Sequence, residues 1–95
     1  WQAGRWLEAE QYAIQSAQVS GSMEPLMRLA MARVISSRSP YTDRTAASLY
    51  LASAQRGNAT AAYYLQRFMH HMDSAEQLEA LHQAQDILEQ ISLGG

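Results

Sequence analysis

The stretch that decides the fold is Asp43-Arg-Thr-Ala-Ala-Ser-Leu-Tyr-Leu-Ala-Ser-Ala-Gln-Arg-Gly57-Asn-Ala-Thr-Ala-Ala-Tyr-Tyr-Leu65. It predicts two amphipathic helices separated at Gly57-Asn58, because glycine readily adopts the left-handed conformation that ends a helix. Small residues recur at Ala47, Ala54 and Ala61, an interval that lets two helix backbones approach closely. A hairpin of this size does not bury its apolar face alone, so the sequence predicts a stacked neighbour.

The composition fits one small globular unit, residues 1–95, and we expect this unit to be a fragment of a longer chain. Hydrophobic residues make up 47% of the 95 residues, and there is no cysteine. The absence of cysteine excludes disulfides, thiolate zinc sites and cysteine nucleophiles. It does not distinguish the bacterial periplasm or envelope from the cytoplasm. No apolar run approaches the ~20 residues that span a bilayer, so we expect no membrane insertion.

The charges are distributed unevenly along the chain. Residues 1–72 hold all seven arginines against four carboxylates, a net charge of +3, whereas residues 73–95 hold five carboxylates and no cation. The acidic segment therefore lies against the basic body, faces a basic partner, or is an ordinary solvated face. The weak, diffuse positive charge of the body does not favour nucleic-acid binding.

Helical spacing of apolar residues predicts five helices and no strand, hence an all-α fold. The first runs from about Arg5 to Val19 and ends near Gly21. The second starts at Ser22 or Met23, and its many apolar residues predict that it is the most buried helix. We expect Ser36–Tyr41 to end the second helix, Thr42 to cap the third helix and Asn58 to cap the fourth.

The last helix is predicted to open with a capping box at Asp73-Ser-Ala-Glu76. Its apolar face is expected to consist of Leu78, Leu81, Ala84, Leu88 and Ile91.

Parts of the chain repeat at a spacing in the mid-thirties. Gly21 and Gly57 are 36 residues apart, and Ser16-Ala-Gln and Ser53-Ala-Gln are 37 apart. One helical hairpin per unit at this spacing is typical of α-solenoids.

Residues 43–65 closely resemble the Sel-one-like repeat, a relative of the tetratricopeptide repeat. The matching positions are Asp43, Ala46, Ala47, Tyr50, Ala54, Gly57, Ala61 and Leu65. Leu49 departs from the pattern, which often has an aromatic there, and so does Gln66, where glycine commonly follows the leucine. Residues 9–30 look like a degenerate earlier copy.

The resemblance implies a right-handed α-α superhelix, a solenoid of about two helical hairpins plus a C-terminal capping helix. Its units would be residues 5–37 (a degenerate repeat), 42–72 (a well-matched repeat) and 73–93 (a half-repeat or cap). It further implies a non-catalytic scaffold that binds a protein or peptide partner, and members are frequent in bacterial envelope, secretion and signalling assemblies.

The residues themselves point to a binding stripe on the first helix of each hairpin, on the face turned away from its partner helix. In such stacks these helices line a concave surface suited to an extended peptide. The stripe comprises Leu7, Gln11, Ile14, Gln18, Arg44, Ser48, Leu51 and Gln55, with Ile14 and Leu51 as the main candidates. The alternatives are a solvated surface, or a face covered by another repeat.

Two other functions are weighed against this one. With so few repeats, the uncovered ends could pair between chains, which would make the protein a homo-oligomerisation module. A small hydrolase or metal site using His70 and His71 is the rival of a different class. These adjacent histidines point about 100° apart on a helix, and the sequence has no catalytic serine motif and no lysine, so we expect no catalytic residues, metal or cofactor.

Overall fold

The computed structural model describes residues 3–37 and 40–94. Its elements in chain order are α1 (Ala3–Ser20), α2 (Glu24–Ser36), the short 3-10 turn η1 (Pro40–Thr42), α3 (Arg44–Gln55), α4 (Ala59–His71) and α5 (Ser74–Gly94). No strand occurs in these two ranges. The predicted all-α class with five α-helices is therefore confirmed for the described residues. Residues 38–39, within the predicted break, lie outside them.

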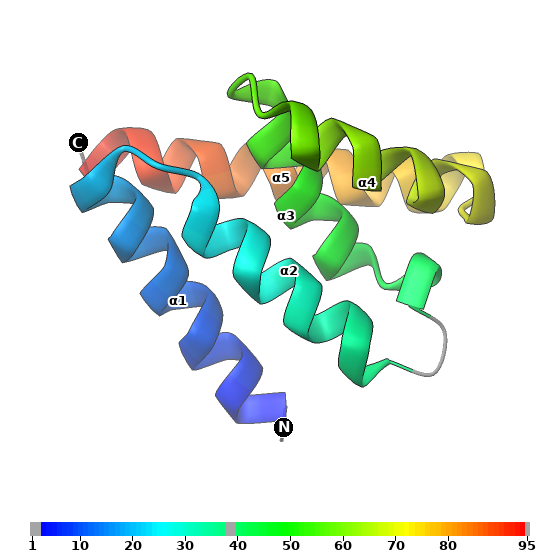
Figure 1. Ribbon diagram of the computed structural model, residues 1–95, viewed down its shortest axis with the longest axis horizontal. Helices are drawn as coiled ribbons and strands as arrows, with labels where there is room; N and C mark the ends of the chain where they lie inside the picture. Colours follow the sequence, from blue (N-terminus) through cyan, green and yellow to red (C-terminus); the bar gives the residue numbers. More distant parts are fainter. Residues whose placement is uncertain (1–2, 38–39, 95) are drawn as a thin grey trace.

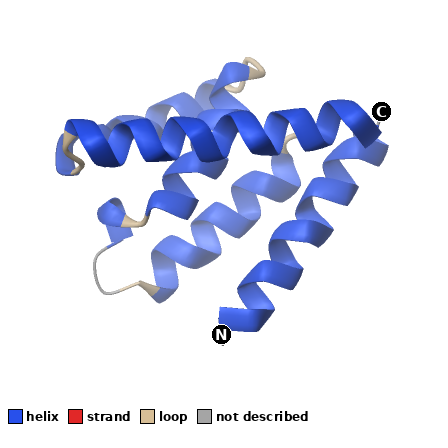
Figure 2. Cartoon of the chain, turned by 180° about the vertical axis from the view of Figure 1, so that it is seen from behind, coloured by secondary structure: helices blue, strands red, loops and turns tan. Residues whose placement is uncertain are grey.

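The first four helices each pack against the next one, and α5 lies across the row. Its most extensive contact is with α3, and it continues to α1, as Figures 1 and 2 show. The last helix therefore packs on the first helix of both hairpins rather than only beside α4.

Local chemistry accounts for the corners between the helices. Gly21 and Gly57 have φ angles of 74° and 94°, in the region that side chains with a Cβ rarely adopt. The Asn58 side chain accepts a hydrogen bond from the N–H of Ala61 at 2.9 Å, as predicted. The capping box of α5 is reciprocal, because the Asp73 carboxylate accepts from the Glu76 N–H and the Glu76 carboxylate accepts from the Asp73 N–H.

The predicted cap of α3 is wrong by one residue. Asp43 occupies that position, and its carboxylate accepts hydrogen bonds from the N–H groups of Thr45 and Ala46 at 3.0 and 3.1 Å. Thr42 is instead the last residue of η1. The turn delays the start of the helix, so the carboxylate reaches the free N–H groups first.

The most buried helix is α3, not α2 as predicted. Seven residues of α3 are buried, against three in α2. The reason is position, because α3 packs against three long helices, α2, α4 and α5, whereas the main neighbours of α2 are α1, α3 and the short turn η1. The apolar side chain of Ile35 at the end of α2 is left 77% exposed.

The predicted apolar face of α5 is rotated relative to the observed one. The buried residues are Ala80, Ala84, Ile87 and Ile91, whereas Leu78 is 52% exposed and Leu81 and Leu88 are half-buried. Small side chains at Ala80 and Ala84 permit the close approach of α5 to α3. Volume at the contact, rather than hydrophobicity alone, selected the face.

Candidate functional site

The expected concave stripe is not an open surface in this structure. Ile14 and Ser48, at its centre, are 5% and 1% exposed. Leu51 is half-buried and packs against the hydrophobic core. The expectation that Ile14 and Ser48 are available at the surface is therefore wrong, because α5 lies across α1 and α3, whereas Leu51 keeps part of its surface accessible.

Polar residues of the stripe hold α5 in place. The amide Nε2 of Gln18 donates to the main-chain carbonyl of Gln90 at 2.7 Å. The Arg44 guanidinium forms a salt bridge with Glu79, so part of the acidic segment does lie against the basic body. Leu7, Gln11 and Gln55, at the two ends of the stripe, remain exposed.

A small hollow of about 170 Å³ is left where α5 crosses the first helices. It is lined by Glu10, Thr45, Ser48, Gln83, Asp86, Ile87 and Gln90. Burial raises the pKa of the Glu10 carboxyl, and the nearby Arg33 guanidinium partly opposes this shift. This hollow is smaller than the pockets of about 300–1,000 Å³ that hold drug-sized ligands.

Arg33 joins three elements above the core. Its guanidinium forms a salt bridge with Asp43 at 3.1 Å and lies over the ring of Trp6 with a distance of 5.0 Å to the centroid. Because Asp43 also caps α3, one partly buried carboxylate links α2 to the start of α3. These contacts fix how the first hairpin sits on α3 and do not form a site.

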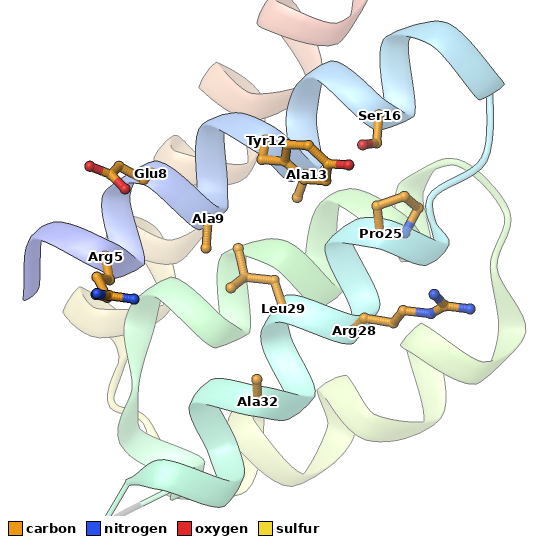
Figure 3. A pocket seen from close by; sticks show the side chains of 10 residues that line it. All are labelled: Arg5, Glu8, Ala9, Tyr12, Ala13, Ser16, Pro25, Arg28, Leu29 and Ala32. Carbon is orange, nitrogen blue, oxygen red and sulfur yellow. The ribbon is translucent and has the colours of Figure 1, made fainter. Parts of the chain in front are cut away.

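A wider concave surface is a groove between α1 and α2, shown in Figure 3. Its volume is about 760 Å³, and we call it the α1/α2 groove. It is lined by Arg5, Glu8, Ala9, Tyr12, Ala13, Ser16, Pro25, Arg28, Leu29 and Ala32.

The floor of the α1/α2 groove is apolar and built from small side chains. Leu29 points from α2 toward Ala9 and Ala13 of α1 (Figure 3) and is only 8% exposed. Tyr12 stands at the edge with 73% of its surface exposed. An exposed tyrosine beside a preformed apolar floor is the combination that anchors protein contacts.

The rim of the groove carries charges of both signs. Arg5 and Glu8 come from α1, and Arg28 of α2 forms an exposed salt bridge with Glu24 at 2.9 Å. A phosphate or nucleic-acid site would need several convergent cations, which this rim does not provide. The rim fits a partner surface of mixed polarity.

A second, shallower hollow lies on the outer side of α4. Its volume is about 350 Å³, and it is lined by Ala62, Leu65, Gln66, Met69 and His70, which we call the α4 face. Met69 and Leu65 are half-buried, and the other three residues are exposed. Among the described residues, α1 and α4 are at opposite ends of the helix row (Figure 1).

The histidines have structural neighbours. The Nδ1 atom of His71 lies 2.9 Å from the main-chain carbonyl oxygen of Arg67, and its ring lies 5.4 Å from that of Tyr41. No cluster of three or more metal-binding side chains occurs in residues 3–37 and 40–94.

The α1/α2 groove did not emerge from the sequence-based reasoning, which concentrated on the other face of α1. A signal was present in the small residues Ala9, Ala13 and Ser16, spaced for one helix face, opposite Leu29 and Ala32. That signal does not say whether another helix covers the face. The packing shows that no helix within residues 3–37 and 40–94 covers it.

Comparisons with protein families, curated proteins and solved structures give no match to this chain. In the described part of the chain, no helix has both the length and the apolar character needed to cross a bilayer.

Proposed function

We propose that this chain is a non-catalytic protein–protein interaction module, built as a short solenoid of Sel-one-like repeats, whose α1/α2 groove binds an amphipathic helix of a protein partner. The observation that carries the proposal is the groove itself, with an apolar floor of Ala9, Ala13 and Leu29 beside the exposed Tyr12. The centre of the stripe, at Ile14 and Ser48, is buried beneath α5, whereas the groove is open to a partner.

The shape of the groove supports a helical partner over an extended peptide. Two neighbouring helices with small residues along their contact leave a channel into which the side-chain ridge of a third helix fits. An extended peptide obtains much of its affinity by main-chain pairing with a sheet edge, and the described residues contain no strand. We therefore expect a partner helix with apolar residues at positions i, i+4 and i+7.

The proposal is tested by selecting helical peptides from a display library on the wild-type protein and measuring their affinities by calorimetry. Tyr12→Ala removes the exposed anchor, and Ala32→Glu places a charge in the groove. Each should weaken binding at least tenfold, which corresponds to about 1.4 kcal/mol. Gln15→Glu, an exposed change on α1 outside the groove, is the matched control and should leave affinity unchanged.

The proposal is overturned if the selected peptides bind both groove variants as tightly as the wild type. Circular dichroism of each variant checks the fold, which should be intact because Tyr12 is largely exposed and Ala32 is only half-buried.

A further inference from the structure

The groove has a counterpart in the second hairpin, and that counterpart is covered. Shifting α1 by the 37-residue repeat places Ala9, Tyr12 and Ser16 on Ala46, Leu49 and Ser53 of α3. All three counterparts are fully buried, at 0% exposure. The same helix face is therefore an accessible groove wall in the first hairpin and an interior surface in the second.

Helix α2 is one of the three helices that pack on α3. It packs along α3 with Leu26 and Ala30 completely buried, and its Arg33 forms the salt bridge with Asp43 at the start of α3. On the α4 side, η1 places the Tyr41 ring 5.7 Å from that of Phe68, which corresponds to Ala32 of the groove by the 36-residue shift. In the second hairpin this helix face is therefore occupied by α2, whereas the corresponding face of the first hairpin, the α1/α2 groove, has no helix packed on it within the described residues.

The same shift identifies the helix that corresponds to α2. Moving α2 by 36 residues places Leu26, Ala30 and Arg33 on Ala62, Gln66 and Met69 of α4. The shift also places Leu29 on Leu65 and Val34 on His70, and these five counterparts are the residues that line the α4 face. The α1/α2 groove thus corresponds to the α3 side of the α2–α3 contact, and the α4 face corresponds to the α2 side.

We propose that the α4 face of one molecule docks into the α1/α2 groove of a second copy of this chain, joining molecules head to tail. The proposal rests on the helix-binding function proposed above and names its partner. Because the two surfaces differ, the contact is heterologous, so each dimer keeps one free groove and one free α4 face, and assembly continues to open chains or closed rings.

The chemistry of the α4 face predicts a reversible contact. Gln66 and His70 stand where α2 has Ala30 and Val34, so the face is more polar than its internal counterpart. Burying Gln66 and His70 costs free energy that burial of the apolar Ala30 and Val34 does not incur. The Met69 side chain, flexible and half-buried, is suited to adapt to the small residues of the groove floor.

Two variants, each blocking one surface, test the proposal. Tyr12→Arg blocks the groove and leaves the α4 face intact, whereas Ala62→Arg blocks the α4 face and leaves the groove intact; both positions are exposed, so the fold should be preserved. In sedimentation velocity over a dilution series, the wild type should grow beyond a dimer with concentration. Each variant alone should be monomeric where the wild type assembles, at least a tenfold loss of affinity.

The decisive sample is the equimolar mixture of the two variants. It contains one intact groove and one intact α4 face per pair, so it should form a dimer and stop there. Gln15→Arg and Gln85→Arg introduce the same cation at exposed positions outside both surfaces and should assemble like the wild type.

Three results would overturn the head-to-tail contact: a wild type that is monomeric at every concentration, a mixture that stays monomeric, or a Tyr12→Arg or Ala62→Arg protein that still dimerises alone. The helix-peptide titration separates this failure from failure of the proposed function. If the wild type is monomeric but its groove binds helical peptides, only the second copy is wrong as the partner. If Tyr12→Arg neither loses peptide affinity nor loses assembly, both proposals are wrong.

Discussion

The two hairpins of this protein have the same kind of glycine corner, but they differ in how far neighbouring helices bury them. Each first helix ends at a glycine with positive φ, Gly21 or Gly57, and the second helix follows after a short link. Around α3 the neighbours α2, α4 and α5 bury seven of the 12 residues of the helix, whereas α1 packs against α2 and α5 and keeps one side open. Position in the row therefore decides whether corresponding helix faces are buried in the core or accessible.

The residues at corresponding positions agree with this difference. Tyr50 of α3, 1% exposed, stacks on Tyr64 with 5.5 Å between the ring centroids, and its counterpart in α1 is the small Ala13 of the groove floor. Where the covered hairpin fills its interior with large aromatic side chains, the open hairpin has a shallow floor.

The largest effect is expected at the pair Leu49 and Tyr12. Leu49→Ala should lower the free energy of unfolding by about 2–5 kcal/mol, because it leaves a cavity in the core. Tyr12→Ala, at the corresponding exposed position, should cost no more than about 0.5 kcal/mol. Urea denaturation measures both, and similar losses would contradict the assignment of the α1 face as accessible surface.

The next effect is a loss of stability at alkaline pH, and it arises from Tyr50 in the more buried second hairpin. Burial, together with the neighbouring Tyr64 and Tyr41 phenols, raises the pKa of Tyr50 to about 12. In the unfolded chain the phenol ionises near pH 10. Its contribution is therefore fully present below pH 10 and is lost as the pH rises toward 12, because the unfolded state releases the proton first.

Tyr50→Phe, whose ring cannot ionise, should flatten the loss of stability between pH 10 and 12. Thermal melts across this range provide the measurement, and Tyr63→Phe, on an exposed side chain, is the control. An unchanged alkaline profile in Tyr50→Phe would assign the loss to other groups.

A smaller effect should be the same in both hairpins. Gly21→Ala and Gly57→Ala each place a Cβ on a backbone with positive φ, and no neighbouring atom lies within 4 Å of that Cβ at either site. Each should therefore cost about 1 kcal/mol from backbone strain alone. Differential scanning calorimetry of the two variants compares them directly, and a cost confined to one corner would show that the corners are not equivalent.

The smallest effect is expected at Glu10, which stands where α3 has the fully buried Ala47. Burial raises the pKa of this carboxyl despite the opposing charge of Arg33, so the folded state binds its proton more tightly than the unfolded state. The ionised group therefore destabilises the fold above the folded-state pKa, and the penalty disappears as the pH falls through that value to the unfolded pKa near 4.3.

Glu10→Gln should raise the free energy of unfolding at pH 7 by no more than about 0.5 kcal/mol and have no effect near pH 4. Chemical denaturation at the two pH values checks this. Glu8→Gln, on an exposed carboxylate of the same helix, is the control and should show no such pH dependence. A gain that persists at pH 4 would rule out desolvation of the carboxylate as its cause.

Much of the local structure could be read from the sequence, because its causes lie within a few residues. The corner glycines, the Asn58 cap and the Asp73–Glu76 capping box were predicted, since each depends on side chains reaching adjacent main-chain groups. The one local error, Thr42 in place of Asp43, arose from a short 3-10 turn that carries little sequence signal.

The candidate site could not be predicted in the same way. The sequence identifies apolar and small faces on α1 and α3, but the amphipathic pattern is the same whether a face is covered by a neighbour or left open. The stripe around Ile14 and Ser48 was therefore expected at the surface, and the groove beside Tyr12 was overlooked.

The sequence alone indicates five helices, the glycine at the corner of each of two similar hairpins, and an acidic last helix. Only the tertiary structure decided that α5 lies across α1 and α3, that α3 is the most buried helix, and that the first hairpin keeps an open groove. Helix caps and corners depend on hydrogen bonds within a few residues of the chain. Which helix faces are buried depends instead on how well surfaces from distant parts of the chain pack together.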